Sequence, residues 1–173
     1  MTFRKATEQD LEAIGLIYDR VHDGEERGET TIGWARAIYP TRATALEAIR
    51  LGTMYVEEDG GRIVAAAKLD QAQVPEYADA RWEHEAPPER VLVLHTLVVD
   101  PLTARRGYGR AFVRFYEEQA LERGCPFLRM DTNARNARAR AMYAKLGYHE
   151  ADIVPCVFNG IPGVQLVCLE KML

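Results

Sequence analysis

Serine is absent from the sequence, which excludes the Ser-His-Asp triad and the G-x-S-x-G elbow of the serine hydrolases. Cysteine is scarce. Cys125, Cys156 and Cys168 form an odd number without C-x-x-C spacing, so we expect reduced thiols rather than a disulfide framework. The four histidines show no metal-ligand spacing with one another or with the cysteines, and we therefore expect no metal site.

Long hydrophobic runs are also missing. No apolar stretch approaches the ~18 residues that a membrane-spanning helix needs, and the opening MTFRKATEQD lacks the apolar core of a signal peptide. We expect a cytoplasmic protein without membrane contact. With 173 residues, 47% of them hydrophobic and 28% charged, the chain is typical of one soluble globular domain, which we expect to span 1–173.

The charges are unevenly divided along the chain. The net charge of −4 argues against a general nucleic-acid binder. Residues 102–145 carry ten Lys or Arg and four Asp or Glu, whereas the rest of the chain carries twelve and twenty-two. This split suggests an anionic ligand on the basic part and a cationic one on the remainder. Charged faces that merely contact water explain it equally well.

Hydrophobic periodicity and turn residues predict an alternation of helices and strands. Helices are expected at 8–22, 108–123 and 136–146, with a further helical stretch from 31 to 52 that Pro40 interrupts. Strands are expected at 3–6, in a hairpin over 53–70, and at 90–100, 127–132, 152–158 and 164–173. Residues 71–89 read as a polar excursion or lid. This order predicts an α/β (α+β) fold, with one central mixed, mostly antiparallel sheet of six or seven strands and about four helices.

One stretch, DPLTARRGYGRAF over 100–112, joins a buried strand to a helix. The first N–H groups of a helix have no internal partners and lie at the positive end of its dipole. Gly107 and Gly109 leave these groups uncovered, so a phosphate can reach them. Arg105, Arg106 and Arg110 add positive charge. Taken alone, the stretch is explained equally well by a tight turn with solvated arginines.

A second motif, NARARAMYAKLGY over 136–148, follows the pattern N-x-x-A-x-x-x-Y-x-x-x-G-[FY]. Together with the preceding strand, loop and helix, it resembles the N-acetyltransferase (GNAT) superfamily. The diphosphate loop of that family, [RQ]-x-x-G-x-[GA], falls on 104–109, where Ala104 replaces the leading Arg or Gln. The resemblance extends over essentially the whole chain, although 7–52 and 71–89 fit the family only loosely.

The resemblance implies acetyl-CoA as the co-substrate and direct transfer of its acetyl group to a primary amine in a ternary complex. The pantetheine arm would lie between two separated central strands and bond to the main chain of Leu97, Val98 and Val99. Asn136 would contact this arm, and Tyr143 would lie near the thioester sulfur. The residues implied in diphosphate binding are Arg105, Arg106, Gly107, Tyr108, Gly109 and Arg110.

The chemistry adds its own requirements. An attacking amine must lose a proton, and the departing thiolate must gain one, which a phenol such as Tyr143 can supply. His95, on the buried strand, is our candidate base. For each of these candidates the sequence leaves a structural alternative: a core aromatic for Tyr143, a helix N-cap for Asn136 and a hydrogen-bonded core histidine for His95.

Several further assignments stay open in the sequence. Glu25, Glu26 and Glu83 could act as bases through water or could be solvated loop charges. Tyr77 and Trp82 could line an acceptor pocket or pin the 71–89 excursion by packing. The acceptor could be a small-molecule or a protein amine, and the terminal strand pair could support a homodimer. A non-catalytic acyl-CoA-binding or sensing module on the same fold is the main alternative function, and a nucleic-acid-binding domain is disfavoured by the acidic remainder.

Overall fold

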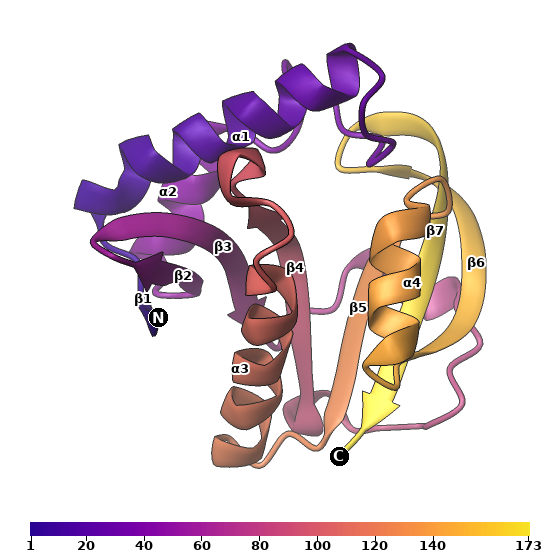
Figure 1. The fold of residues 1–173 in the computed structure, drawn as a ribbon. Coiled ribbons are helices and arrows are strands. Elements are labelled where there is room, and N and C mark those ends of the chain that lie inside the picture. Colours follow the sequence, from indigo (N-terminus) through magenta and orange to yellow (C-terminus); the bar gives the residue numbers. More distant parts are fainter.

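The computed structural model describes residues 1–173, and its seven strands form one sheet in the order β1-β2-β3-β4-β5-β7-β6 (Figure 1). Neighbouring strands are antiparallel except for the central pair, β4 and β5. The strands are β1 (Thr2–Lys5), β2 (Met54–Asp59), β3 (Arg62–Asp70), β4 (Val91–Val99), β5 (Phe127–Asn133), β6 (His149–Phe158) and β7 (Ile161–Met172). The helices are α1 (Leu11–Glu26), α2 (Arg42–Arg50), α3 (Tyr108–Glu122) and α4 (Ala137–Lys145). The predicted fold class is confirmed.

Helices cover both faces of the sheet (Figure 1). The apolar sides of α1 and α2 pack on one face, where Ile14 and Ile17 meet Val56 and Val98. The apolar side of α3 packs on the other face, in a cluster that also takes in Tyr143 of α4. Residues 71–89, which contain only short 3₁₀ turns, cover the part of the first face that β5, β6 and β7 form. This excursion is therefore packed structure rather than a detached lid.

Two predicted helices differ from the structure. The first continues to Glu26, because Gly24 is buried and the Glu25 carboxylate anchors the following loop through the main-chain N–H of Ile32. The second begins only after Pro40, so the prediction of a helix over 31–39 was wrong. Thr41 caps it, with its hydroxyl accepting a hydrogen bond from the Thr44 N–H at 3.3 Å.

A bulge in β4 separates the two central strands. Pairing of β4 with β5 covers only 91–94 against 127–130, after which the strands diverge (Figure 1). In the ladder with β3 the register shifts between Ala66 and Lys68, and Thr96 takes a φ of +54°, in the left-handed region that a β-branched residue rarely adopts. The main-chain edge of β4 beyond Leu94 is thereby left without a strand partner on the β5 side.

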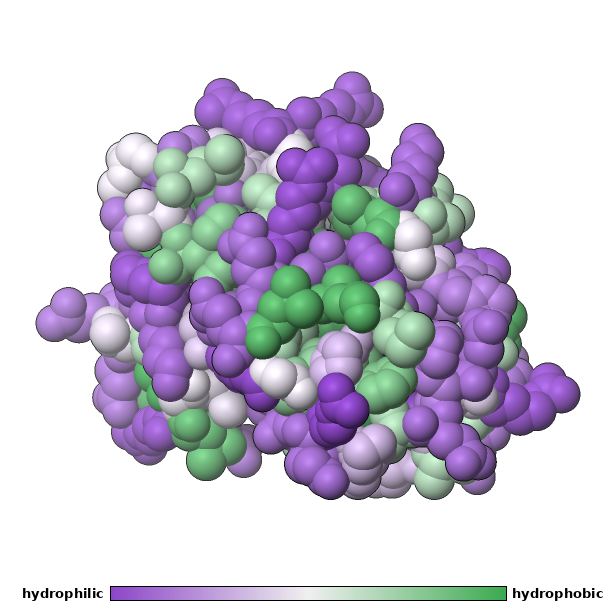
Figure 2. All heavy atoms as spheres, turned by 90° about the horizontal axis from the view of Figure 1, so that it is seen from below, coloured by the Kyte–Doolittle hydropathy of each residue, from purple (hydrophilic) through white to green (hydrophobic).

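The end of the sheet where β4 and β5 begin is seen from below in Figure 2. Hydrophilic side chains cover most of this surface and enclose a group of hydrophobic ones. Leu121, Met172 and Leu173, at the ends of α3 and β7, are 62%, 53% and 38% exposed. None of the helices is long and apolar enough to cross a membrane. The cavities described next lie at the other end of the two strands.

Candidate active site

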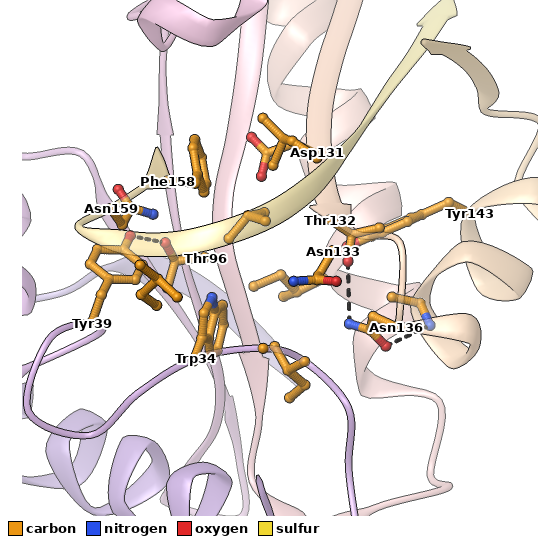
Figure 3. Close-up of a pocket in the computed structure, with 17 residues that line it drawn as sticks. Trp34, Tyr39, Thr96, Asp131, Thr132, Asn133, Asn136, Tyr143, Phe158 and Asn159 are labelled. Carbon is orange, nitrogen blue, oxygen red and sulfur yellow. Dashed lines mark hydrogen bonds between the residues drawn. The ribbon is translucent and has the colours of Figure 1, made fainter. Parts of the chain in front are cut away.

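Two adjoining cavities occupy the end of the sheet where β4 and β5 diverge. The inner cavity, of about 100 Å³, lies between the two strands and is bounded by α4, the 32–39 loop and the β6–β7 hairpin (Figure 3). The outer cavity, of about 330 Å³, lies toward α2 and β3. Residues that line both cavities are Tyr39, Thr96, Asp131, Phe158 and Asn159. Two molecules could therefore approach a common point from different sides.

Asp131, near the end of β5, is the one acidic side chain that lines both cavities. Its Oδ2 accepts a hydrogen bond of 2.7 Å from the Tyr77 hydroxyl. Burial raises the pKa of Asp131 to about 6, and the Tyr77 hydrogen bond opposes this rise. The carboxylate is thus mostly ionised at neutral pH and still basic enough to accept a proton.

Sequence reasoning missed Asp131. The only signal was an acidic residue within the predicted strand FLRMDT, and strand periodicity alone does not show that the neighbouring strand has moved away. A half-buried carboxylate that lines a cavity and has no cationic partner is a typical functional arrangement.

Tyr143 enters the inner cavity from α4 (Figure 3). It is 6% exposed, and its ring packs edge-on against Tyr148 with 6.0 Å between ring centroids. Burial raises the pKa of the Tyr143 phenol above its ordinary value, so the hydroxyl keeps its proton at neutral pH. It belongs to the core on the α3 face, whereas the Tyr77 partner of Asp131 belongs to the core on the opposite face. The Tyr143 and Asp131 side chains therefore reach the inner cavity from opposite sides of the sheet.

The start of α3 offers free main-chain donors. The first hydrogen bond of the helix runs from the Ala111 N–H to the Gly107 carbonyl at 3.0 Å, so the N–H groups of Tyr108, Gly109 and Arg110 have no partner in the helix. Gly107 has a φ of +88°, and a Cβ placed on it would meet no atom within 4 Å. This open concave turn fits an anionic diphosphate.

The side chains around this turn divide into two groups. Arg105, Arg106 and Arg110 are exposed and make no ion pair, so they are free to face an anion. The Tyr108 hydroxyl instead donates to Asp59 at 2.7 Å, which leaves only its main-chain N–H for a ligand. A Cβ on Gly109 would lie 3.4 Å from the Met142 sulfur, so this glycine allows α3 to approach α4 closely.

The other implied contacts for acetyl-CoA lie along the inner cavity. Leu97 lines it, and Val98 and Val99 continue the unpaired edge of β4. Asn136 caps α4, as its structural alternative predicted, because its Oδ1 accepts from the Ala139 N–H at 3.2 Å. Its Nδ2 donates to the Thr132 hydroxyl at 3.2 Å, and the residue also lines the cavity (Figure 3).

His95 lies apart from the inner cavity. Its Nε2 is 3.0 Å from Asp70 Oδ1, and the Lys68 ammonium is 3.1 Å from Asp70 Oδ2. Burial alone would raise the pKa of Asp70, but the hydrogen bonds from His95 and Lys68 outweigh it and hold that pKa at about 2. His95 lines only the outer cavity. The structure thus shows a hydrogen-bonded histidine at the outer cavity, in agreement with the structural alternative that the sequence left open for His95.

The remaining candidates from the sequence have structural partners. Glu25 accepts from the Ile32 and Gly33 N–H groups, each at 2.8 Å, and Glu26 pairs with Arg36 at 2.9 Å. Neither they nor Glu83 line the inner or outer cavity. Trp82 pins the excursion, with its Nε1 donating to the Tyr77 carbonyl at 2.9 Å.

One group of side chains that sequence spacing did not indicate could share a cation. Ligand atoms of Glu83, His84 and Glu170 lie within 4.8 Å of one another. Arg129 lies opposite Glu170 in the β5–β7 ladder and already places a positive charge there. The three cysteines are free thiols, as predicted.

Comparisons with known proteins agree with this geometry. The sequence matches the model of the acetyltransferase (GNAT) family over residues 18–148. The [ribosomal protein bS18]-alanine N-acetyltransferase of Escherichia coli (strain K12) is 38% identical over 60 residues, which cover 35% of this chain and 40% of that relative. The chain thus matches less than half the length of this curated relative.

Solved structures show the same fold. An acetyltransferase of the GNAT family from Streptococcus agalactiae has a TM-score of 0.80 at 22% identity, covering 99% of this chain and 95% of that one. A ribosomal-protein-alanine N-acetyltransferase from Brucella melitensis has a TM-score of 0.73 at 21% identity, over 100% of both chains. A Salmonella typhimurium protein solved with its cofactor acetyl-CoA has a TM-score of 0.71 at 17% identity, over 99% and 93%. From the family match and the site together, the chain belongs to the acetyltransferase (GNAT) family.

Proposed function

We propose that the protein is an acetyl-CoA-dependent N-acetyltransferase that transfers an acetyl group to a primary amine by direct attack in a ternary complex. The observation that carries the proposal is the meeting of two cavities at Asp131, with Tyr143 reaching the inner one from the other side of the sheet. The family match supports the choice of donor.

Acetyl-CoA supplies the activated acetyl group when it is bound. The N–H groups of Tyr108, Gly109 and Arg110 would bind its diphosphate, with the exposed arginines beside them. The free main-chain edge of Leu97, Val98 and Val99 would bond to its pantetheine arm, and Asn136 would border that arm. Contacts of this kind would bring the thioester end of acetyl-CoA into the inner cavity.

The acceptor amine would enter through the outer cavity. A free amine has a pKa near ~10 and arrives as an ammonium ion, so it must lose a proton before it attacks. Asp131 is placed to take that proton at its carboxylate, in the role that the sequence suggested for His95. The Tyr143 hydroxyl holds the proton that the departing sulfur needs.

The lining of the outer cavity favours a cationic acceptor. Asp131 and Glu47 carry negative charge there, while Lys68 and His95 are engaged by Asp70. Small-molecule amines and protein amines both fit this description. The name of the Escherichia coli relative, which refers to an alanine of a ribosomal protein, supports a protein N-terminal amine as the first class to test. A cytoplasmic location and a homodimer through the terminal strands remain predictions.

Thiol release from acetyl-CoA tests the proposal. Wild-type protein should release CoA with at least one member of a panel of small amines, amino acids and short peptides with free N-termini. Asp131→Asn should lower kcat/KM by about 10²-fold or more, the range of one general base. Glu122→Gln, which removes an exposed carboxylate at the end of α3, is the matched control and should have no effect. Tight binding of acetyl-CoA without CoA release from any acceptor would instead indicate the sensing module.

A further inference from the structure

Tyr77, in the 71–89 excursion, is fixed in place from several sides. The side chain is 3% exposed within a cluster that includes Val93 and Leu166. The Trp82 ring packs edge-on against it, with 5.1 Å between ring centroids. The Arg129 guanidinium lies 4.2 Å from the centroid of the Trp82 ring, which secures that ring in turn. A phenol held in this way has little freedom to turn its hydroxyl elsewhere.

The Tyr77 hydroxyl makes the one hydrogen bond that Asp131 receives. It donates to Oδ2 at 2.7 Å, and Oδ1 has no partner within the protein. Burial raises the pKa of Tyr77 well above its ordinary value, so this hydroxyl remains a donor throughout the neutral range. One carboxylate oxygen is therefore occupied by the excursion, and the other is left for a ligand.

We propose that Tyr77 is a positioning residue, which orients the Asp131 carboxylate and stabilises its ionised form so that Oδ1 is presented to the acceptor amine. This inference rests on the proposed role of Asp131 as the base. A hydrogen bond to the charged form of a buried acid favours that form. Neither of the two motifs found in the sequence includes residues of the 71–89 excursion. In this proposal the excursion nevertheless contributes to catalysis, because it supplies Tyr77.

Several titratable groups other than Tyr77 also lie around Asp131. They are Glu76 of the excursion, His95 of β4, Tyr39 of the 27–41 loop, Tyr143 of α4, Cys156 of β6 and Cys168 of β7. Glu76 disfavours ionisation of Asp131, and His95 favours it. The effect of Tyr77 on the pKa of Asp131 must therefore be measured with these groups unchanged. Tyr77→Phe meets this condition, because it removes a single hydroxyl group.

The test is the pH dependence of kcat/KM in Tyr77→Phe, which removes one hydroxyl and keeps the ring. We expect the acidic limb of the profile to move upward by about one pH unit, so that activity falls about fivefold at pH 6, approaches a tenfold loss below about pH 5, and recovers at high pH. Tyr148→Phe is the matched control, because it also removes a buried tyrosine hydroxyl, but one without a hydrogen-bond partner, and its acidic limb should not move. An equal loss at every pH, or an unchanged profile, would show that Tyr77 only supports the fold.

Asp131→Asn, measured in parallel, separates this inference from the proposed function. Full activity of Asp131→Asn would remove Asp131 as the base and the proposed role of Tyr77 with it. An inactive Asp131→Asn together with an unshifted Tyr77→Phe profile would overturn the inference alone. Carbon-13 NMR of the wild-type protein decides the same point without a variant, since the Tyr77 Cζ resonance should shift as Asp131 titrates and a constant resonance would contradict the coupling.

Discussion

Two buried tyrosines lie side by side, and only one of them lines the inner cavity. Tyr143 faces the cavity, whereas the Tyr148 hydroxyl is buried without a hydrogen-bond partner. We expect Tyr143→Phe to lower kcat by tenfold or more with little change in the Kd for acetyl-CoA, because the departing sulfur loses its proton donor. Steady-state kinetics and calorimetry measure the two quantities.

Tyr148→Phe is the matched control for that experiment. It also removes a buried hydroxyl, but one that no group in the protein uses, so kcat should be unchanged. Equal kcat values for Tyr143→Phe and the wild type would remove Tyr143 from the mechanism. Equal losses in both variants would assign the effect to packing.

Single residues also mark the limit of prediction from sequence. Tyr143 and Asn136 were found because their spacing follows a family pattern, and the structure places both at the inner cavity. Asp131, the base proposed above, was not among the candidates from the sequence, since His95 has the more suitable ordinary pKa and an aspartate within a strand does not by itself indicate a cavity. Only the three-dimensional arrangement shows that His95 is engaged by Asp70 and that Asp131 faces a cavity.

At the scale of elements, the ends of α3 provide an internal comparison. Gly107, before the helix, and Gly124, after it, both have positive φ and open space around a potential Cβ. Gly107→Glu and Gly124→Glu should therefore impose similar backbone strain, of about 1 kcal/mol or more. Only Gly107→Glu places a side chain and a negative charge over the free N–H groups, so we expect it alone to abolish acetyl-CoA binding in calorimetry.

Loss of acetyl-CoA binding in both glycine variants would point to a general effect on the fold. Retained binding in Gly107→Glu would refute the assignment of the α3 start as the diphosphate site. Thermal melting of the two variants, measured alongside, establishes that their stabilities are comparable before the binding results are compared.

Elements with strong periodicity were predicted nearly to the residue, and those shaped by tertiary contacts were not. The helix at 108–123 agrees with α3 within one residue, since its apolar spacing and terminal glycines act locally. The helix predicted over 31–39 fails, because Glu25 holds the start of that loop by its main-chain N–H groups. The bulge at Thr96 has no local signal, although it opens the site.

At the scale of the whole molecule, two kinds of carboxylate make the stability depend on pH: those whose pKa is raised in the folded protein and those whose pKa is lowered. Burial raises the pKa of Glu57 from 4.5 to about 7, and that of Asp131 from 3.8 to about 6. Glu57 is fully buried, and neither of its carboxylate oxygens has a hydrogen-bond partner. Asp10 and Asp70, by contrast, have pKa values of about 2, because hydrogen bonds from Arg4 and from His95 with Lys68 overcome the cost of burial.

The two kinds act in opposite directions. A raised pKa means that the folded state binds more protons than the unfolded state, so Glu57 and Asp131 lower the stability as pH rises from about 4 to 8. A lowered pKa means the reverse, so the stability from Asp10 and Asp70 is present above about pH 4 and is lost as pH falls toward 2. The free energy of unfolding should therefore be greatest between about pH 4 and 5 and fall by a few kcal/mol toward pH 8, at about 1.4 kcal/mol per pKa unit.

Urea unfolding of the wild type and of Glu57→Gln across this pH range tests the argument. An amide cannot ionise, so Glu57→Gln should be more stable than the wild type at pH 8, by about 1–3 kcal/mol, and nearly equal to it at pH 5. Glu122→Gln, at an exposed site, should follow the wild-type curve throughout. A constant difference between Glu57→Gln and the wild type at all pH values would mean that Glu57 does not titrate in the folded protein. Glu57 lies on β2, away from both cavities, so Glu57→Gln should also leave kcat unchanged. Asp131→Asn, by contrast, should raise the free energy of unfolding at pH 8 and lower the activity.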